Sequence, residues 1–150
     1  ESGPMPYELD GELRTTGTYD FGGSLREAFT AHTKYDARCD ELHAVTYYPT
    51  WDPVRHVVID RTGTVARTTR IPVADSPMMH DFALTARYVV FMDLPIVFNL
   101  DIALEGKGDM PYRWDDGYGA RLGVLRRDDP FGEVRWFDID PCYVFHVANA

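Results

Sequence analysis

Short runs rich in β-branched residues alternate with polar turn residues along most of the chain. This pattern is typical of β-strands joined by tight connections. Residues 54–60 and 64–71 are two such runs, and the Arg-Thr-Gly segment between them predicts a hairpin in which glycine supplies the turn. Further strands are predicted at residues 41–48, 81–84, 88–93, 121–126, 133–139 and 143–147.

The connections between the predicted strands favour an all-β fold. Asp-Asp-Pro-Phe-Gly at 128–132 is a strong turn sequence, and residues 85–87 form another tight connection. Helical periodicity is nearly absent: residues 24–31 are ambiguous, and residues 101–119, rich in Gly and Asp, are expected to form a long loop. Recurring hairpins suit a sandwich or a propeller. At about 40–50 residues a blade, the chain would supply about three blades, whereas a closed ring needs at least about four.

The composition excludes some classes of function. The chain has 150 residues, of which 45% are hydrophobic and 26% charged, as in an ordinary globular domain. Its net charge is −9 and its longest basic run is the pair Arg126-Arg127, so nucleic acid is not an expected partner. No run of about 18 apolar residues is present to span a bilayer, although an apolar patch could still contact lipid.

Both ends of the sequence predict an incomplete chain, because residues 1–4 contain neither an initiator Met nor a signal segment, and residue 150 lies beside a predicted strand. Cys39 and Cys142 are too few for a disulfide scaffold. One bridge stays open, but reduced cysteines in a cytoplasmic protein are favoured. Cys142 lies four residues before His146, yet a buried inert cysteine explains it better than a mixed thiolate site.

Five histidines are candidates for metal chemistry: His32, His43, His56, His80 and His146. None forms a short-range pair such as His-x-x-x-His, so any metal site has to be assembled from distant segments. A propeller axis can provide that arrangement, because the inner strand of each blade points one end toward the same centre. Taken singly, each histidine is better explained by a surface or hydrogen-bonded core position, and His43 and His56 look like ordinary strand residues.

Four segments resemble motifs of the carotenoid cleavage oxygenase family, in the same order along the chain. Met-His-Asp-Phe-Ala-Leu-Thr-Ala-Arg-Tyr-Val-Val-Phe at 79–91 closely resembles the family signature that contains a histidine ligand. Phe-Thr-Ala-His-Thr-Lys-Tyr-Asp at 29–36 is similar to its Ala-His-Pro-Lys segment, and Phe-His-Val-Ala-Asn-Ala at 145–150 to its Phe-His-x-x-Asn-Ala segment. Glu-Ser-Gly-Pro-Met-Pro-Tyr at 1–7 resembles its Glu-x-x-x-x-Pro-Tyr segment.

The chain also departs from the family pattern. Thr33 stands where the family usually has Pro, and residues 36–42 (Asp-Ala-Arg-Cys-Asp-Glu-Leu) replace the more usual Asp-Pro-x-Thr-Gly-Glu-Leu. Both changes put the shape of a loop in doubt more than the binding of a metal ion. The larger departure is an absence, since the family's fourth histidine would lie beyond residue 150.

The resemblance implies an all-β fold that is a fragment of a seven-bladed β-propeller, with residues 1–150 as a partial domain of about three blades. It also implies an Fe(II) centre held by four neutral imidazoles, three of them from His32, His80 and His146. Glu1 falls on a family glutamate whose carboxylate would accept a hydrogen bond from the His80 ring and keep that ring oriented. A solvated terminal carboxylate is the alternative for Glu1.

The activity implied by the resemblance is that of a non-haem Fe(II) dioxygenase, which cleaves a conjugated C=C bond of a carotenoid or apocarotenoid with O₂ to give two carbonyl products. The expected partners are an apolar conjugated substrate and O₂, with no obligate protein partner, in a cytoplasmic protein that could contact a membrane peripherally. Cleavage of a stilbene-type (lignostilbene) interphenyl double bond, an isomerohydrolase reaction and, in a different class, a non-catalytic propeller that binds ligands stay as alternatives. Residues 1–150 alone are expected to be inactive.

By the same resemblance, the substrate does not bind the metal ion but lies beside it in an apolar tunnel. Aromatic residues make up 13% of the chain, which is compatible with such a tunnel. Phe82, Trp136 and Phe145 are candidates for its wall, although packing in the core explains each of them better.

Overall fold

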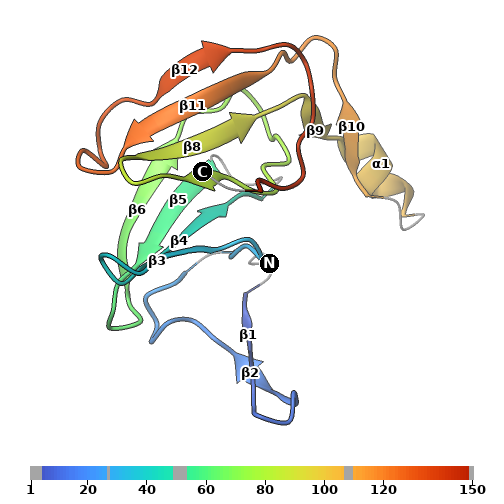
Figure 1. The fold of residues 1–150 in the computed structure, drawn as a ribbon. Coiled ribbons are helices and arrows are strands. Elements are labelled where there is room, and N and C mark those ends of the chain that lie inside the picture. The colour runs from blue at the N-terminus through green and yellow to red at the C-terminus, as the bar shows by residue number, and fades with distance from the viewer. Residues whose placement is uncertain (1–4, 27, 49–53, 107–109, 149–150) are drawn as a thin grey trace.

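Antiparallel hairpins make up most of the described chain (Figure 1). The computed structural model describes residues 5–26, 28–48, 54–106 and 110–148. Its strands are β1 (Tyr7–Leu9), β2 (Thr15–Thr18), β3 (Lys34–Asp36), β4 (Glu41–Thr46), β5 (Val54–Ile59), β6 (Val65–Ile71), β7 (Ala83–Leu84), β8 (Tyr88–Asp93), β9 (Ile96–Phe98), β10 (Tyr112–Trp114), β11 (Arg121–Arg126) and β12 (Arg135–Asp138). The described residues contain one short helix, α1 (Leu100–Glu105), so the all-β prediction is confirmed.

The first four-stranded sheet is a meander with the strand order β3-β4-β5-β6. Across the β5–β6 hairpin, Val54 pairs with Ile71. Gly63 adopts a left-handed backbone conformation with a φ of 76°, and Asp60 Oδ1 accepts a hydrogen bond from the Thr62 amide at 2.8 Å. These two features close the turn, and the hairpin predicted from the sequence is confirmed.

The second four-stranded sheet has the strand order β12-β11-β8-β7. Strand β11 pairs with β8, although β9, α1 and β10 lie between them in the chain. Both β8 and β11 have the predicted bounds, and the turn after β7 is closed by the Thr85 amide, which donates to the Tyr88 carbonyl at 2.9 Å. Strands β9 and β10 form a separate two-stranded sheet.

The two four-stranded sheets meet along one apolar core. Its buried members are Val45, Val54, Ile71, Met79, Phe82, Val89, Phe91 and Leu125. Both sheets contribute, and Met79 and Phe82 come from the segment that leads from β6 to β7. Removing apolar surface from water stabilises this packing by about 25 cal/mol per Å². His80 lies between these two buried residues in the chain, so the core fixes the place of its backbone.

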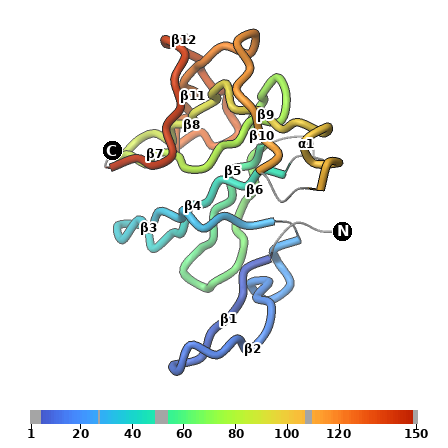
Figure 2. The backbone as a smooth tube through the Cα atoms, turned by 90° about the vertical axis from the view of Figure 1, so that its right-hand side faces the viewer, coloured from blue at the N-terminus to red at the C-terminus, as the bar shows by residue number. Residues whose placement is uncertain are grey.

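The β1–β2 hairpin stands apart from both sheets. Figures 1 and 2 show it projecting away from them. Tyr7 pairs with Thr18 across it, and Leu9 and Leu13 are exposed on it. Neither strand is predicted from the sequence, because this part of the chain is rich in polar residues and shows little alternation.

The predicted loop at residues 101–119 is wrong, because this range contains most of α1 and the whole of β10. Asn99 caps the helix by accepting a hydrogen bond from the Ile102 amide at 3.0 Å, and Gly106 ends it with a φ of 63°. The polar and glycine residues of this region therefore cap and connect short elements. In the described part of the chain, no helix is both long enough and apolar enough to cross a membrane.

The predicted strand at residues 143–147 is also wrong. The described part of this segment pairs with no strand: the Tyr143 hydroxyl donates to the Met78 carbonyl, and the Val147 amide donates to the Asp81 carboxylate, both at 2.9 Å. The side chains of Tyr143 and Val147 also pack against the cluster of Met92, Leu94 and Ala120. Figure 2 shows the C-terminal end beside β7. The ambiguous residues 24–31 form neither helix nor strand where the structure describes them.

Candidate metal centre

Three of the five histidines converge from separate parts of the chain. His32 precedes β3, His80 precedes β7, and His146 follows β12 in the C-terminal segment. His32 Nε2 lies 2.9 Å from His80 Nε2, and one ring nitrogen of each histidine lies within 4.8 Å of the others. The structure thus brings together the three histidines that the family motifs contain. Their binding of a metal ion stays a prediction.

The donor set fits a divalent transition-metal ion. Imidazole nitrogens bind such ions at about 2.0–2.1 Å, so two adjacent ligands of one ion lie about 3 Å apart. The two Nε2 atoms of His32 and His80 have this separation, at 2.9 Å. His146 is exposed, and one of its ring nitrogens lies within 4.8 Å of a ring nitrogen of each of the other two. Imidazole suits iron among several first-row metals, so these residues could hold Fe(II) without selecting it by themselves.

The surroundings of His80 favour the form that can bind a metal ion. Burial lowers the pKa of His80, and the neighbouring rings of His32 and His146 lower it further. A lowered pKa keeps the imidazole neutral at neutral pH, and a metal-binding imidazole must be neutral at its donor nitrogen. The nitrogen contact between His32 and His80 also requires that one nitrogen carries a proton and the other does not.

An apolar cavity of about 470 Å³ adjoins the histidines. His32 and His80 line it together with aromatic residues that include Phe29, Tyr47 and Tyr112. Its volume is within the range of small-molecule sites, which are about 300–1,000 Å³. Burial raises the pKa of Tyr112, so its phenol keeps its proton and can donate a hydrogen bond. The arrangement can hold an apolar molecule with one part beside the imidazoles.

The aromatic residues considered from the sequence do not line this cavity, as far as the described residues define it. Phe82 is fully buried in the core, and Trp136 packs against the core and beneath the Arg121 guanidinium at 4.0 Å, so core packing is confirmed for both. Phe145 is half-exposed and lies edge-on to His80, with ring centroids 5.6 Å apart. Among the wall aromatics, Phe29 lies in the segment that contains His32, whereas Tyr47 and Tyr112 lie in no segment that resembles a family motif.

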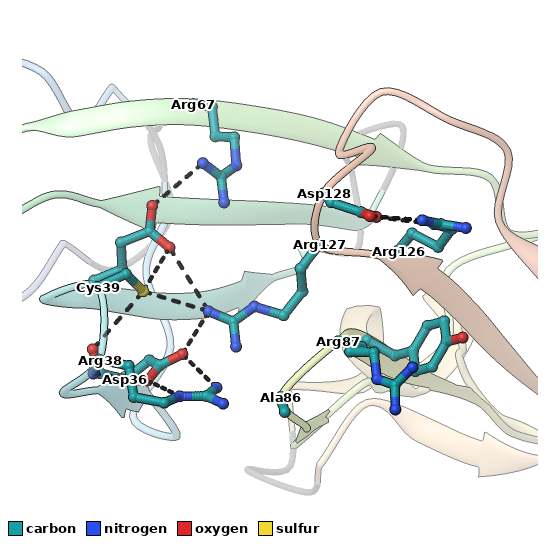
Figure 3. Close-up of a pocket in the computed structure, with 11 residues that line it drawn as sticks. Asp36, Arg38, Cys39, Arg67, Ala86, Arg87, Arg126, Arg127 and Asp128 are labelled. Carbon is teal, nitrogen blue, oxygen red and sulfur yellow. Dashed lines mark hydrogen bonds and ion pairs between the residues drawn. The ribbon is translucent and has the colours of Figure 1, made fainter.

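A second group of ligand-type side chains is not predicted from the sequence. Donor atoms of Cys39, Glu41 and His43 also lie within 4.8 Å of one another. Arg127 reaches into this group from the β11–β12 turn, beside a polar pocket of about 540 Å³ (Figure 3). Its Nη2 lies 2.6 Å from Asp36 Oδ2, 3.4 Å from His43 Nε2 and 3.5 Å from Cys39 Sγ. The guanidinium therefore takes the position of a cation among these groups.

His43 and His56 form a buried pair inside the first sheet, with His43 Nδ1 3.1 Å from His56 Nε2. Burial lowers the pKa of His43 to about 4, and the positive charge of Arg127 adds to the effect. Burial also lowers the pKa of His56 to about 3. Both rings are therefore neutral parts of the core, and a signal for this pairing is absent from the sequence because the contact depends on strand register.

Two further candidates from the sequence lie elsewhere. Cys142 packs against Met92 and Leu94, and it does not join the three histidines in the described part of the chain. Both cysteines are free thiols. Glu1 lies outside the described residues, so its contact with His80 stays a prediction.

The sequence matches known proteins along its whole length. Residues 1–150 match the family described as retinal pigment epithelial membrane protein. A carotenoid cleavage oxygenase of Mycobacterium tuberculosis is 38% identical over 188 residues, which cover 100% of this chain and 38% of that protein. A carotenoid 9,10(9',10')-cleavage dioxygenase of Crocus sativus is 40% identical over 144 residues, covering 94% of this chain and 26% of that protein. The chain thus spans well under half the length of these relatives.

Solved structures share the fold. The crystal structure of Pseudomonas brassicacearum lignostilbene dioxygenase superposes with a TM-score of 0.74 and 28% identity, covering 92% of this chain and 29% of that one. Cobalt-substituted Synechocystis apocarotenoid oxygenase superposes with a TM-score of 0.75 and 23% identity, covering 97% of this chain and 33% of that one. The second likeness supports the fold alone.

Proposed function

Since the chain belongs to the family of the retinal pigment epithelial membrane protein and the carotenoid cleavage oxygenases, we propose that the protein containing it is an Fe(II)-dependent dioxygenase of carotenoids or apocarotenoids. It would cleave a conjugated C=C bond with O₂ to give two carbonyl products. The observation that carries this proposal is the convergence of His32, His80 and His146 beside an apolar cavity of about 470 Å³. A non-catalytic binding propeller has no need of three converging imidazoles.

The chain's own residues would bind and orient the reactants. His32, His80 and His146 would hold the iron, and the family resemblance places a fourth histidine beyond residue 150. When bound, Fe(II) supplies the redox chemistry that adds O₂ across the double bond. The apolar wall of the cavity would hold the hydrocarbon and exclude water, while burial keeps His80 neutral. Glu1 would orient His80 by accepting a hydrogen bond from its ring.

The decisive experiment uses the full-length protein reconstituted with Fe(II). We expect O₂-dependent loss of a carotenoid's visible absorption and two carbonyl products by mass spectrometry. The His32→Ala variant should form neither product, because the iron would lose a ligand. Turnover in His32→Ala at the wild-type rate would refute the proposal, and so would a folded wild-type protein that neither binds iron nor cleaves any conjugated substrate. Residues 1–150 alone should be inactive, since the fourth histidine is absent from them.

A stilbene substrate is the second candidate. The superposition with a lignostilbene dioxygenase favours it, because the two chains share 28% sequence identity in addition to the fold. The phenols of Tyr47 and Tyr112 on the cavity wall could also donate hydrogen bonds to a hydroxylated aromatic ring. Parallel turnover of an apocarotenoid and a hydroxystilbene by one preparation would distinguish the two, and a clear preference for the stilbene would replace the first candidate.

Contact with a membrane surface is proposed through α1 and its flank. Leu100 and Leu104 on the helix and Met110 after it are 59%, 74% and 60% exposed. Phe98 and Tyr112, on either side of this segment, line the cavity, so an apolar substrate could pass from lipid to the cavity along it. Replacing Leu104 by Ser should weaken cosedimentation of the full-length protein with neutral phosphatidylcholine vesicles. Unchanged cosedimentation would remove this surface from the proposal.

A further inference from the structure

The segments that carry the three histidines are not joined by strand pairing. His32 leads into β3 in the first sheet, and His80 leads into β7 in the second. His146 lies in a segment that belongs to neither sheet. Something other than backbone pairing must hold the three rings in one constellation, because a ligand set needs its donor atoms placed to within about 0.5 Å.

One buried carboxylate connects all three segments. Asp81 directly follows His80 and is 2% exposed. Its Oδ1 lies 2.9 Å from the Nζ of Lys34, which is two residues beyond His32. Its Oδ2 accepts a hydrogen bond from the backbone amide of Val147, the residue after His146, at 2.9 Å. A single side chain therefore contacts a near neighbour of two ligands and is itself adjacent to the third.

We propose that Asp81 is the positioning residue that holds His32, His80 and His146 together for one metal ion. This inference rests on the metal centre of the proposed function. Bonds from a carboxylate to an ammonium group and to backbone amides are charge-assisted, and they are shorter and stronger than neutral hydrogen bonds. Because Asp81 is buried, its carboxylate needs these partners: leaving it unpaired away from water would cost the folded state free energy. For Val147, whose segment has no strand partner, this carboxylate is the acceptor that fixes the backbone beside His146.

A purely stabilising role is the competing explanation, and the second sheet provides a matched control. Asp93 is also fully buried, and its carboxylate lies 2.8 Å from Arg121 Nε and 2.6 Å from the Tyr118 hydroxyl. It resembles Asp81 in burial and in having a basic partner, but none of these contacts adjoins one of the three histidines. If Asp81 serves stability only, its loss should resemble the loss of Asp93.

The test compares Asp81→Asn, Lys34→Met and Asp93→Asn in the full-length protein. In Asp81→Asn, one carboxylate oxygen becomes an NH₂ donor, so the amide of either Val147 or Phe82 faces another donor. We expect the affinity of the apoprotein for Co(II), followed by visible absorption, to fall by about 10- to 100-fold, with an altered Co(II) spectrum. Lys34→Met should show a smaller loss in the same direction. Asp93→Asn should keep the wild-type affinity and spectrum at temperatures where it is folded.

The possible results distinguish the role of Asp81 from the existence of the metal centre. Wild-type Co(II) affinity and spectrum in Asp81→Asn, with a lowered melting temperature like that of Asp93→Asn, would overturn the inference and leave the metal centre intact. Co(II) binding by the wild type no different from that by His80→Ala would overturn the metal centre itself, and the inference with it. If Asp81→Asn does not fold, Lys34→Met decides, because the Lys34 side chain is 28% exposed and tolerates the change more readily. Unchanged Co(II) affinity in Lys34→Met would then overturn the inference.

Discussion

Two groups of ligand-type side chains each lie close together in this molecule but differ in charge. In each, the donor atoms lie within 4.8 Å of one another. The group of His32, His80 and His146 consists of imidazoles and borders an apolar cavity. Cys39, Glu41 and His43 form the second group, and each of them contacts the guanidinium of Arg127. Figure 3 shows Arg127 beside Cys39. Closeness of donor atoms is therefore not enough to indicate a metal site.

The difference lies in where the positive charge comes from. A metal ion entering the second group would have to displace Arg127 and break its 2.6 Å contact with Asp36. This displacement is costly, because Arg127 is largely buried and Asp36 would be left with the exposed Arg38 as its basic partner. The three imidazoles of the first group can instead direct their lone pairs at a cation supplied from solution. The first group is thus suited to binding, and the second to joining the two sheets.

The largest expected effect is on iron content, which should be lost when the first group is mutated and kept when the second group is mutated. In the full-length protein, His80→Ala should abolish the binding of one Fe(II) per chain, because it removes a ligand. His43→Ala should keep its iron, because the ring of His43 is buried beside Arg127 and is not one of the three converging histidines. Elemental analysis of both purified variants checks this. Stoichiometric iron in His80→Ala, or its loss from folded His43→Ala, would reverse the assignment.

The next effect concerns stability. Arg127→Met should lower the free energy of unfolding by about 1.5–3 kcal/mol, because its side chain is only 11% exposed and Asp36 would keep only the exposed Arg38, at 2.8 Å, as its basic partner. The neighbouring Arg126→Met is the control: both partners of the Arg126–Asp128 pair are exposed, so its loss should cost no more than about 1 kcal/mol. Urea unfolding of the two variants measures the difference. Equal midpoints would show that Arg127 does not hold the sheets together.

Acid should weaken the second group through His43 and through His56, whose ring contacts His43 at 3.1 Å. The folded pKa values of His43 and His56, about 4 and about 3, lie below the ordinary value of 6.5. The unfolded state therefore binds more protons below pH 6.5, so their stabilisation is present above that pH and is lost as the pH falls toward 4. The loss is at most about 1.4 kcal/mol per pH unit for each histidine.

Urea unfolding at pH 7.5, 6.0 and 5.0 measures this dependence. His56→Gln removes one of the two titrating groups, so the stability of that variant should fall less steeply with pH than the stability of the wild type. A slope as steep as that of the wild type would mean that the acid sensitivity arises elsewhere in the protein.

The smallest effect is expected at Cys39. Cys39 is an exposed residue, but partial burial of its sulfur and the contact with Glu41 raise the pKa of the thiol. The group therefore stays a thiol and does not become a metal-binding thiolate. Cys39→Ser should change the free energy of unfolding by no more than about 0.5 kcal/mol and leave iron content unchanged. Iron loss in this variant would make the second group a metal site after all.

Local patterns predicted much of the sheet structure. The hairpin around Gly63 and the bounds of β8 and β11 follow from alternation and turn residues, because these report directly which side chains are buried. The same reasoning missed β9 and β10 and placed a strand around His146. Short elements of this kind depend on caps such as Asn99 and on single side-chain contacts, which alternation does not record.

The sequence by itself determined the all-β character and singled out His32, His80 and His146 as candidate ligands, because each histidine lies in a recognisable local segment. The tertiary structure alone decided that their ring nitrogens meet, that His43 belongs to a group already occupied by Arg127, and that Asp81 connects the three histidine-bearing segments. The physical reason is the distance along the sequence over which each kind of interaction acts. Turns and alternation act between residues a few positions apart, whereas these contacts join residues 47 to 114 positions apart and exist only once the sheets have packed.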